Sequence, residues 1–401
     1  MKLLRLLIFV LSAFFCAVSA AGAERPVVWN MDRLERVRET LPGNRLCRRA
    51  LSDLRRRCDS LLPVPNPHVM MKRAVPASGD RHDYMSLSRY YWPDPGSADG
   101  FPYVRRDGET NPDVDLYDRN RITELADNVC ALTVGFYLTD DLRYGAKAGE
   151  MIRTWFLDEA TSMNPGLDYS QMIPGKNGGK GRPSGIIDMY RMIDVLDAVV
   201  VLRDKEVLLD GEMERLRSWF SRLVDWMLTA PNALKIAEGR NNLGVAYDVQ
   251  LIRYAMFSGR TELARRTLAQ FPERRLAVQI EPDGRMPQEL KRTKAMSYSI
   301  YNIVHMLDAC AMARALGEDL YEAEGRAVER ALRFLVPFLK DPDSFPYKQI
   351  NERRLALDDI ARQLLRADAY AGNKEFRRLY DRYGAEPEDP IFILFHLTTV
   401  P

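Results

Sequence analysis

Residues 239–250 read Gly-Arg-Asn-Asn-Leu-Gly-Val-Ala-Tyr-Asp-Val-Gln, a polar start followed by a largely apolar run. Asparagine side chains compete for backbone hydrogen bonds, so they favour helix ends over helix interiors. One interpretation is that Asn241 or Asn242 caps a helix that begins near Leu243. The other is that the paired amides and the neighbouring Arg240 direct polar groups toward a ligand outside the helix.

Helical periodicity extends outward from this stretch over most of the chain. Apolar residues recur at spacings of three and four, and strand signals are nearly absent. Helices are predicted at 33–62 (interrupted at 42–43), 121–138, 142–156, 187–202, 211–228, 244–257, 262–271, 298–316, 320–339, 354–371 and 374–383. They recur in pairs without a fixed-length repeat, and such pairs stack into a solenoid or close into a toroid.

The first 23 residues have the pattern of a secretory signal peptide. Two basic residues precede an apolar run over 6–18, and small residues follow it. We expect cleavage after Ala20 or Ala23 and release into a periplasm or the outside, with no membrane association afterwards. No low-complexity linker divides residues 24–401, which are therefore expected to form one domain.

Charge and cysteine content argue against several classes of function. Removing the leader takes away Lys2 and Arg5, which leaves 56 basic and 56 acidic residues and a formally neutral chain. Neutrality argues against a general nucleic-acid or membrane-surface binder. The remaining cysteines do not have metal-site or disulfide spacing, and we expect all of them in the core. They are Cys47, Cys58, Cys130 and Cys310.

Three long irregular segments, 63–116, 164–185 and 280–295, interrupt the helices. Insertions of this length in a compact domain are usually functional, and we expect these to rim the open face of a toroid. The first alternates aromatic residues, including Tyr84, with arginines. Aromatic faces stack on sugar rings and arginine binds carboxylates in a fork, so the pattern suits an acidic sugar. The alternative is an aromatic cluster that packs the loop onto the body.

The second segment is rich in glycine and carries Lys176, which predicts a basic lip or merely a solvated basic turn. It lacks the Gly-Lys-Ser/Thr ending and the preceding strand of a phosphate-binding loop, so a nucleotide site is rejected. Just after the third segment, Tyr298 follows several cations that are predicted to lower its pKa and prepare it for proton transfer. The alternative is that Tyr298 and Tyr301 pack inward.

These motifs, taken in order over roughly residues 75–350, resemble the alginate lyase domain family. No single motif decides the assignment, but their ordered series is specific. The resemblance rests on HDYMSL at 82–87, WPDP at 92–95, PYVRRDG at 102–108, QMIPG at 171–175, GIID at 185–188, the Asn-Asn pair, QIEPDGR at 279–285, RTK at 292–294 and FPYKQ at 345–349.

The resemblance implies an all-α fold, a single α/α toroid or incomplete barrel of helical hairpins with long loops over an open cleft. It also implies β-elimination on an anionic polysaccharide, at a 4-O-linked uronic acid. A base removes the C5 proton, an acid assists departure of the oxygen at C4, and the neighbouring carboxylate must be neutralised. Amide and guanidinium donors neutralise the carboxylate without a metal or other cofactor. A calcium ion with a purely structural role remains an alternative.

By position in the family, the catalytic residues correspond to Asn242, Arg292 and Tyr298. The resemblance implies that Asn242 and Arg292 hold the carboxylate while Tyr298 transfers protons. Further residues are expected to bind substrate. They are Gln171, Asn241, His82, Tyr84, Arg240, Lys176, Tyr301 and Tyr347.

The chain departs from the family at one position, where Asn-Asn-His-Gly is replaced by Asn-Asn-Leu-Gly, with Leu243 in place of the histidine. Leu243 cannot transfer a proton, and His82 is the substitute base that the sequence offers. If Tyr298 acts alone, proton and leaving group must share one face of the sugar. That geometry predicts mannuronan or glucuronan over guluronan. The alternatives are a uronate-binding protein without turnover and, less favoured, a glycoside hydrolase with paired carboxylates.

Overall fold

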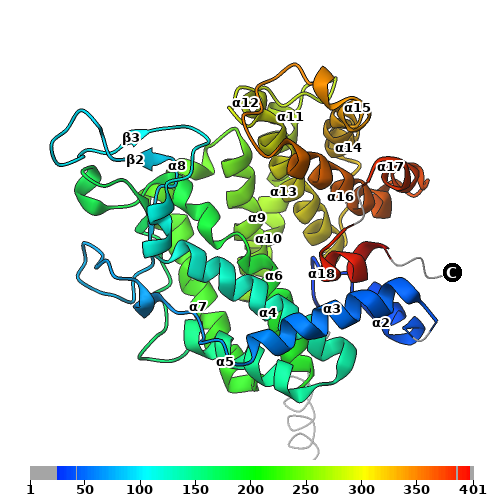
Figure 1. The fold of residues 1–401 in the computed structure, drawn as a ribbon, viewed down its shortest axis with the longest axis horizontal. Coiled ribbons are helices and arrows are strands. Elements are labelled where there is room, and N and C mark those ends of the chain that lie inside the picture. Colours follow the sequence, from blue (N-terminus) through cyan, green and yellow to red (C-terminus); the bar gives the residue numbers. More distant parts are fainter. Residues whose placement is uncertain (1–24, 42, 385–386, 398–401) are drawn as a thin grey trace, which may run out of the picture.

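A computed structural model describes residues 25–41, 43–384 and 387–397, so the predicted leader lies outside the described residues. Helices dominate the fold (Figure 1). The longer ones are α2 (Met31–Thr40), α3 (Arg45–Leu61), α4 (Arg119–Thr139), α5 (Leu142–Phe156), α6 (Met192–Asp204), α7 (Asp210–Thr229), α9 (Asn242–Phe257), α10 (Thr261–Phe271), α13 (Ala295–Ala315), α14 (Ala323–Leu335), α16 (Arg353–Ala371) and α17 (Glu375–Tyr383). Short helices are α8 (Pro231–Ala237), α11 (Ala277–Gln279), α12 (Pro287–Leu290), α15 (Pro337–Lys340) and α18 (Pro390–Phe392).

The helices form two layers. In the inner layer α4 packs against α6, α6 against α9, α9 against α13, and α13 against α16. Outside them, α5 packs on α4, α7 and α10 pack on α9, and α14 packs on α13 and α16. Helices α6, α9 and α13 are buried on nearly every side, as helices enclosed by others must be. This is the α/α toroid that the sequence predicts.

The predicted helix boundaries are confirmed except at a few places. The segment 187–202 becomes helical only at Met192, because residues 183–189 form a 3-10 turn packed against β4. The segment 320–339 divides into α14 and α15, and Pro337 begins the second helix because proline cannot donate within a helix interior. Helix α8 was not predicted, and it too begins with a proline, Pro231.

The irregular segments carry two small sheets. Strand β1 (Met85–Leu87) pairs in parallel with β4 (Tyr169–Met172), and β2 (Tyr91–Trp92) pairs antiparallel with β3 (Val104–Arg105). The β1–β4 pair joins the first irregular segment to the second. The β2–β3 hairpin projects from the helical body at the upper left of Figure 1.

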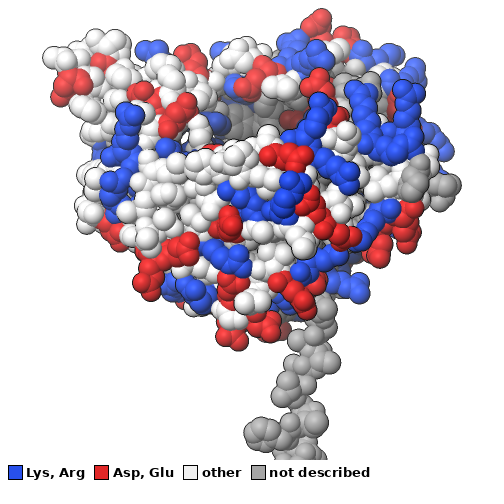
Figure 2. All heavy atoms as spheres, turned by 60° about the horizontal axis from the view of Figure 1, so that its bottom comes forward, with Lys and Arg blue, Asp and Glu red and all other residues white. Residues whose placement is uncertain are grey.

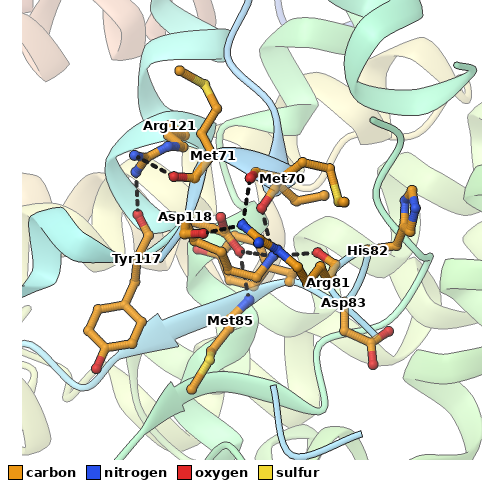
Figure 3. A network of polar contacts seen from close by, with 12 residues as sticks. Met70, Met71, Arg81, His82, Asp83, Met85, Tyr117, Asp118 and Arg121 are labelled. Carbon is orange, nitrogen blue, oxygen red and sulfur yellow. Dashed lines mark hydrogen bonds and ion pairs between the residues drawn. The ribbon is translucent and has the colours of Figure 1, made fainter. Parts of the chain in front are cut away.

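A buried polar network anchors the first irregular segment to the start of α4 (Figure 3). Lys72 Nζ lies 3.0 Å from Asp118 Oδ2 and also donates to the carbonyls of Val69 and Arg81. Burial raises the pKa of Asp118 to about 6 and lowers the pKa of Lys72, although each partner opposes the shift of the other. The same Asp118 oxygen accepts from the backbone N–H of Met85, which fixes β1.

Two further expectations concern the core and the membrane. All four cysteines outside the leader are buried, as expected for core residues. Within the described part of the chain, no helix combines the length and apolar character needed to cross a membrane.

Candidate active site

A cavity of about 510 Å³ lies where the three irregular segments meet the starts of α9 and α13 and the wall of α16. The prediction that these segments surround one open site is therefore confirmed. The lining residues are Ser88, Arg89, Tyr90, Tyr91, Arg105, Thr110, Arg119, Gln171, Arg182, Ser184, Ile187, Asn242, Leu243, Arg292, Lys294, Ser297, Tyr298, Ile300, Tyr301, Val304, Glu352, Asp359 and Gln363.

The cavity is strongly cationic. Of the described residues that line it, six are lysine or arginine and only two, Glu352 and Asp359, are acidic. One of those acids is already paired, because Glu352 Oε2 lies 3.0 Å from Lys294 Nζ. Over most of the outer face in Figure 2, by contrast, charges of both signs are interspersed. Cations and aromatic rings gathered in one cavity suit a sugar that carries a carboxylate.

Tyr298 lies on the first turn of α13 and faces the hairpin segment. Its hydroxyl lies 3.2 Å from the Tyr90 hydroxyl and donates to it, and the Arg292 guanidinium carbon is 3.7 Å from the Tyr298 ring centroid. The prediction that cations lower the pKa of Tyr298 is wrong. Burial and then Tyr90 raise that pKa well above its usual value, and the opposing effect of Arg292 is smaller.

Arg292 is held in place from the first irregular segment. Its Nη2 lies 2.9 Å from Asp107 Oδ1, and the Thr293 hydroxyl donates to Asp107 Oδ2 at 2.9 Å. Burial opposes ionisation of Asp107, but the hydrogen bonds from Arg292 and Thr293 outweigh it and lower its pKa to about 2. The Nε of Arg292 is buried and has no hydrogen-bond partner among the described residues.

Asn242, the first residue of α9, lines the cavity but is almost entirely buried. Its backbone N–H donates to Glu289 Oε1 at 2.7 Å and its Nδ2 donates to Glu289 Oε2 at 2.6 Å. Within the described chain, Asn242 Oδ1 has no hydrogen-bond partner. Burial raises the pKa of Glu289 to about 7, against the lowering effect of the Asn242 hydrogen bonds.

Gln171 enters the cavity from the second irregular segment. Its backbone has φ +51°, a left-handed conformation that few residues other than glycine adopt. Its Nε2 donates to Asp188 Oδ1 at 2.9 Å, and its Oε1 accepts from the Ser184 hydroxyl at 2.8 Å. Asp188 also pairs with Arg119, so this carboxylate fixes an amide and a guanidinium of the cavity at once.

Tyr301 lines the cavity as predicted, one turn beyond Tyr298. Its ring contacts the imidazole of His305, with centroids 4.1 Å apart, and burial raises its pKa to about 12. His305 is fully buried behind it, and burial lowers the pKa of that imidazole to about 3. Leu243, at the position of the family histidine, does line the cavity.

Tyr84, Asn241 and His82 were predicted to contact substrate, and the structure corrects all three. Tyr84 is fully buried and donates to Asp188 at 3.1 Å, so it supports the site from behind. Asn241 caps α9 by accepting from the Leu243 N–H at 3.3 Å, which is the first of the two interpretations above. The His82 Nδ1 lies 2.6 Å from the Ser162 carbonyl oxygen, outside the cavity lining, and Figure 3 shows its ring directed away from the neighbouring network.

Three more predicted residues lie outside the lining of the cavity. Lys176 is exposed, with its Nζ 5.7 Å from the ring centroid of the lining residue Tyr91. Arg240 is exposed on the surface just before α9. Tyr347 packs on Phe345, with ring centroids 5.5 Å apart. Their types suit sugar binding, but none of the three is among the residues that line the cavity.

Several lining residues were not singled out from the sequence. Tyr90 and Tyr91 belong to the first irregular segment, whose aromatic composition already indicated sugar binding. Arg119 is the first residue of α4, and nothing in the sequence around it indicates a role in the site. Glu289, which binds Asn242 from outside the lining, could have been suspected because an acid three residues before Arg292 is out of place among cations.

Comparison with known proteins agrees with this architecture. Residues 68–345 match the family model described as alginate lyase. A curated alginate lyase from Pseudomonas fluorescens is 25% identical over 139 residues, a match that spans 34% of this chain and 36% of the relative. A crystal structure of an alginate lyase from Bacteroides ovatus is 38% identical, with 94% of this chain and 100% of that chain covered and a TM-score of 0.90.

A more distant neighbour shares the fold alone. It is a variant of alginate lyase A1-III, complexed with a tetrasaccharide, with 16% identity and a TM-score of 0.60. The alignment covers 95% of this chain and 98% of that chain. Another structure of that enzyme is from Sphingomonas species A1.

Proposed function

The chain belongs to the alginate lyase family of polysaccharide lyases, and we propose that it cleaves 4-O-linked uronic acid polymers by β-elimination. The reaction leaves a 4,5-unsaturated uronate at the new end. The observation that carries the proposal is the meeting of Tyr298, Arg292 and Asn242 in one cationic cavity. The alginate lyase A1-III complex with a tetrasaccharide supports an oligosaccharide-sized substrate.

Arg292 and Asn242 neutralise the carboxylate of the uronate that is cleaved. Proton loss at C5 moves charge onto this carboxylate, so donors placed there stabilise the transition state more than the ground state. The Nε of Arg292 supports this role because it has no hydrogen-bond partner among the described residues, and the hydrogen bond from its Nη2 to Asp107 fixes the guanidinium. Gln171 on β4 and Arg119 at the start of α4, both held by Asp188, assist in this neutralisation.

Tyr298 carries the proton from C5 to the glycosidic oxygen. As phenolate it takes the C5 proton; the electron pair forms the C4–C5 double bond as the C4–O bond breaks. The resulting phenol then gives its proton to the departing oxygen, so the tyrosine ends as it began. A raised pKa makes the phenolate scarce but a stronger base, and Arg292 over the ring favours its formation.

One tyrosine serves both steps only when the C5 proton and the C4 oxygen lie on the same side of the ring. D-mannuronate and D-glucuronate satisfy this condition, whereas L-guluronate does not. On the other side a second proton acceptor would be needed, and Leu243 in the cavity wall cannot supply one. Mannuronate-rich alginate or glucuronan is therefore the proposed substrate.

The place of action follows from the leader. We infer that residues 1–23 direct export and are removed after Ala20 or Ala23. Residues 24–401 then act as one domain in the periplasm or outside the cell, where an anionic polysaccharide is the partner. The reaction as written uses only side chains of this chain.

The decisive experiment follows ultraviolet absorbance of the C4–C5 double bond during incubation with polymannuronate, glucuronan and polyguluronate. We expect absorbance to rise on the first or second substrate. Tyr298→Phe should abolish the rise, whereas Tyr347→Phe, which removes a hydroxyl outside the cavity, should not. Flat traces with intact binding would replace the proposal by a uronate-binding protein. New reducing ends without absorbance would indicate a hydrolase.

A further inference from the structure

Glu289 on α12 is a buried acid, and both of its carboxylate oxygens accept hydrogen bonds from Asn242. Its side chain does not line the cavity and is only 1% exposed. Oε1 accepts from the backbone N–H of Asn242 and Oε2 accepts from its Nδ2, at 2.7 and 2.6 Å. The contact joins the third irregular segment to the start of α9.

Helix geometry explains why the acid is tolerated there. The first N–H groups of a helix lack intrahelical acceptors, and the helix dipole favours an anion beside them. Asn241 accepts from the Leu243 N–H, and Glu289 accepts from the Asn242 N–H. Among charged groups, Arg292 also acts on Glu289 and favours its ionised form.

A neutral cap would satisfy the backbone of α9 equally well, but it would not fix the side chain of Asn242. An ionised carboxylate only accepts, so the amide can face it only through Nδ2. The edge of the amide turned away from Glu289 then carries Oδ1, which is buried, and the second Nδ2 hydrogen. That edge belongs to a residue that lines the cavity, and Oδ1 has no partner among the described residues.

We propose that Glu289 is a positioning residue, which fixes the Asn242 amide so that it presents one donor and one acceptor to the uronate. The inference rests on the proposed function. The donor meets a carboxylate oxygen of the substrate, and Oδ1 accepts from a sugar hydroxyl. Glu289 itself does not touch the substrate.

Glu289→Gln tests the proposal because it reverses the pairing without emptying the space. The glutamine keeps one acceptor for the Asn242 N–H, but its Nε2 now faces the amide and turns Oδ1 inward. The fold should tolerate the change, because glutamine matches glutamate in size and can still accept from the Asn242 N–H. We expect kcat/KM on the preferred uronan to fall on the order of 10- to 100-fold, as misplaced catalytic groups do.

A double-mutant cycle separates positioning from a general structural effect. In an Asn242→Ala background, Glu289→Gln should change kcat/KM by less than about twofold, because the side chain through which Glu289 acts is gone. Glu329→Gln is the matched control: Glu329 is also buried, accepts from Tyr321 at 3.0 Å and lies outside the cavity lining. Its kcat/KM should equal that of the wild type. Additive losses in the cycle would overturn the proposal.

A stability measurement keeps the test independent of turnover. Asn242→Asp alone places two acceptor-only carboxylates together and should lower the melting temperature, since like charges repel. Adding Glu289→Gln supplies a donor and should restore it. A wild type without lyase activity would sink the proposed function. A double variant that fails to regain stability, or a Glu289→Gln enzyme with wild-type kcat/KM, would instead sink the role of Glu289.

Discussion

The guanidinium of Arg292 lies over the ring of Tyr298, its central carbon 3.7 Å from the ring centroid, while its Nη2 is bound to Asp107 at 2.9 Å. One planar cation thus touches the proton-transferring ring and is tied to the hairpin segment. Lysine cannot reproduce this arrangement, because its ammonium is a point charge without a flat face or a fork of donors.

We therefore expect Arg292→Lys to lower kcat/KM on polymannuronate by about 10²- to 10³-fold, the range seen when a transition-state donor is removed. Arg105→Lys is the control, because Arg105 also binds Asp107, at 2.7 Å, but is 55% exposed at the rim. It should stay within about threefold of the wild type, as expected of an exposed pair. Equal losses in both variants would mean that the Asp107 contact, and not the stacked guanidinium, matters.

The pH dependence of the reaction should depend on Tyr90. The Tyr298 hydroxyl donates to Tyr90 at 3.2 Å, and this bond favours the neutral phenol, so it raises the pKa of Tyr298 beyond the effect of burial. The phenolate fraction increases with pH, so kcat/KM of the wild type should still be rising at roughly pH 9. Tyr90→Phe removes the bond and should move the rising limb toward lower pH.

The measurement is kcat/KM between roughly pH 7 and 10, the range in which an ordinary tyrosine begins to ionise. Tyr91→Phe serves as control, since Tyr91 lines the same cavity, whereas the largest effects on the pKa of Tyr298 come from burial and Tyr90. A limb that keeps its position in Tyr90→Phe, or shifts equally in both variants, contradicts the assignment of Tyr298 as the titrating base.

Asp197 on α6 should govern stability without affecting chemistry. It is fully buried, pairs with Arg253 at 2.8 Å, and accepts the backbone N–H groups of Val27, Val28 and Trp29. Asp197→Ala leaves the buried Arg253 without this carboxylate and removes the acceptor of the backbone N–H groups of residues 27–29. We expect the free energy of unfolding to fall by about 3–5 kcal/mol, as when one partner of a buried pair is removed.

Denaturant titration measures this loss. Asp225→Ala provides the comparison, because Asp225 is 63% exposed and its pair with Arg260 should contribute no more than about 1 kcal/mol. The Asp197→Ala protein that remains folded should keep its kcat/KM, since Asp197 lies outside the lining of the cavity. A stability equal to that of Asp225→Ala would show that the first described residues are held by other contacts.

The helical architecture was predictable because most helices have an apolar period that their burial requires. Helix α9 shows where that reasoning weakens, since it buries Asp248, Gln250 and Arg253 along with its apolar residues. The two charged residues have partners distant in sequence, Arg275 for Asp248 and Asp197 for Arg253, whereas Gln250 bonds within α9. Apolar periodicity is a property of a single helix, so it cannot predict buried polar groups whose hydrogen-bond partners lie on other helices of the toroid.

The site was predictable in type more than in detail. Asn241 and Asn242 are adjacent and chemically identical, yet one caps α9 and the other lines the cavity. The difference depends on Glu289, which lies 47 positions along the chain. Arg292 likewise depends on Asp107, 185 positions away. The pKa of Tyr298 was predicted with the wrong sign, because the sequence shows the nearby cations but not the burial that outweighs them.

Leu243 offers the sharpest test of the stereochemical argument. It lines the cavity at the position where the family resemblance implies a histidine, on the start of α9 beside Asn242. An imidazole there would provide a proton acceptor with a pKa near neutrality. Leu243→His should therefore raise the rate on polyguluronate at least tenfold, in the range that one positioned acid–base group supplies, while the rate on polymannuronate changes little.

Val304→His controls for the chemistry of adding any imidazole, because Val304 is another apolar residue of the cavity wall, on α13 with Tyr298. It should give no gain on polyguluronate. Absorbance measured on defined guluronate and mannuronate oligomers distinguishes the two substrates directly. A wild type that already prefers polyguluronate, or an equal gain from both histidine variants, would mean that a proton acceptor other than Tyr298 serves the second face of the sugar.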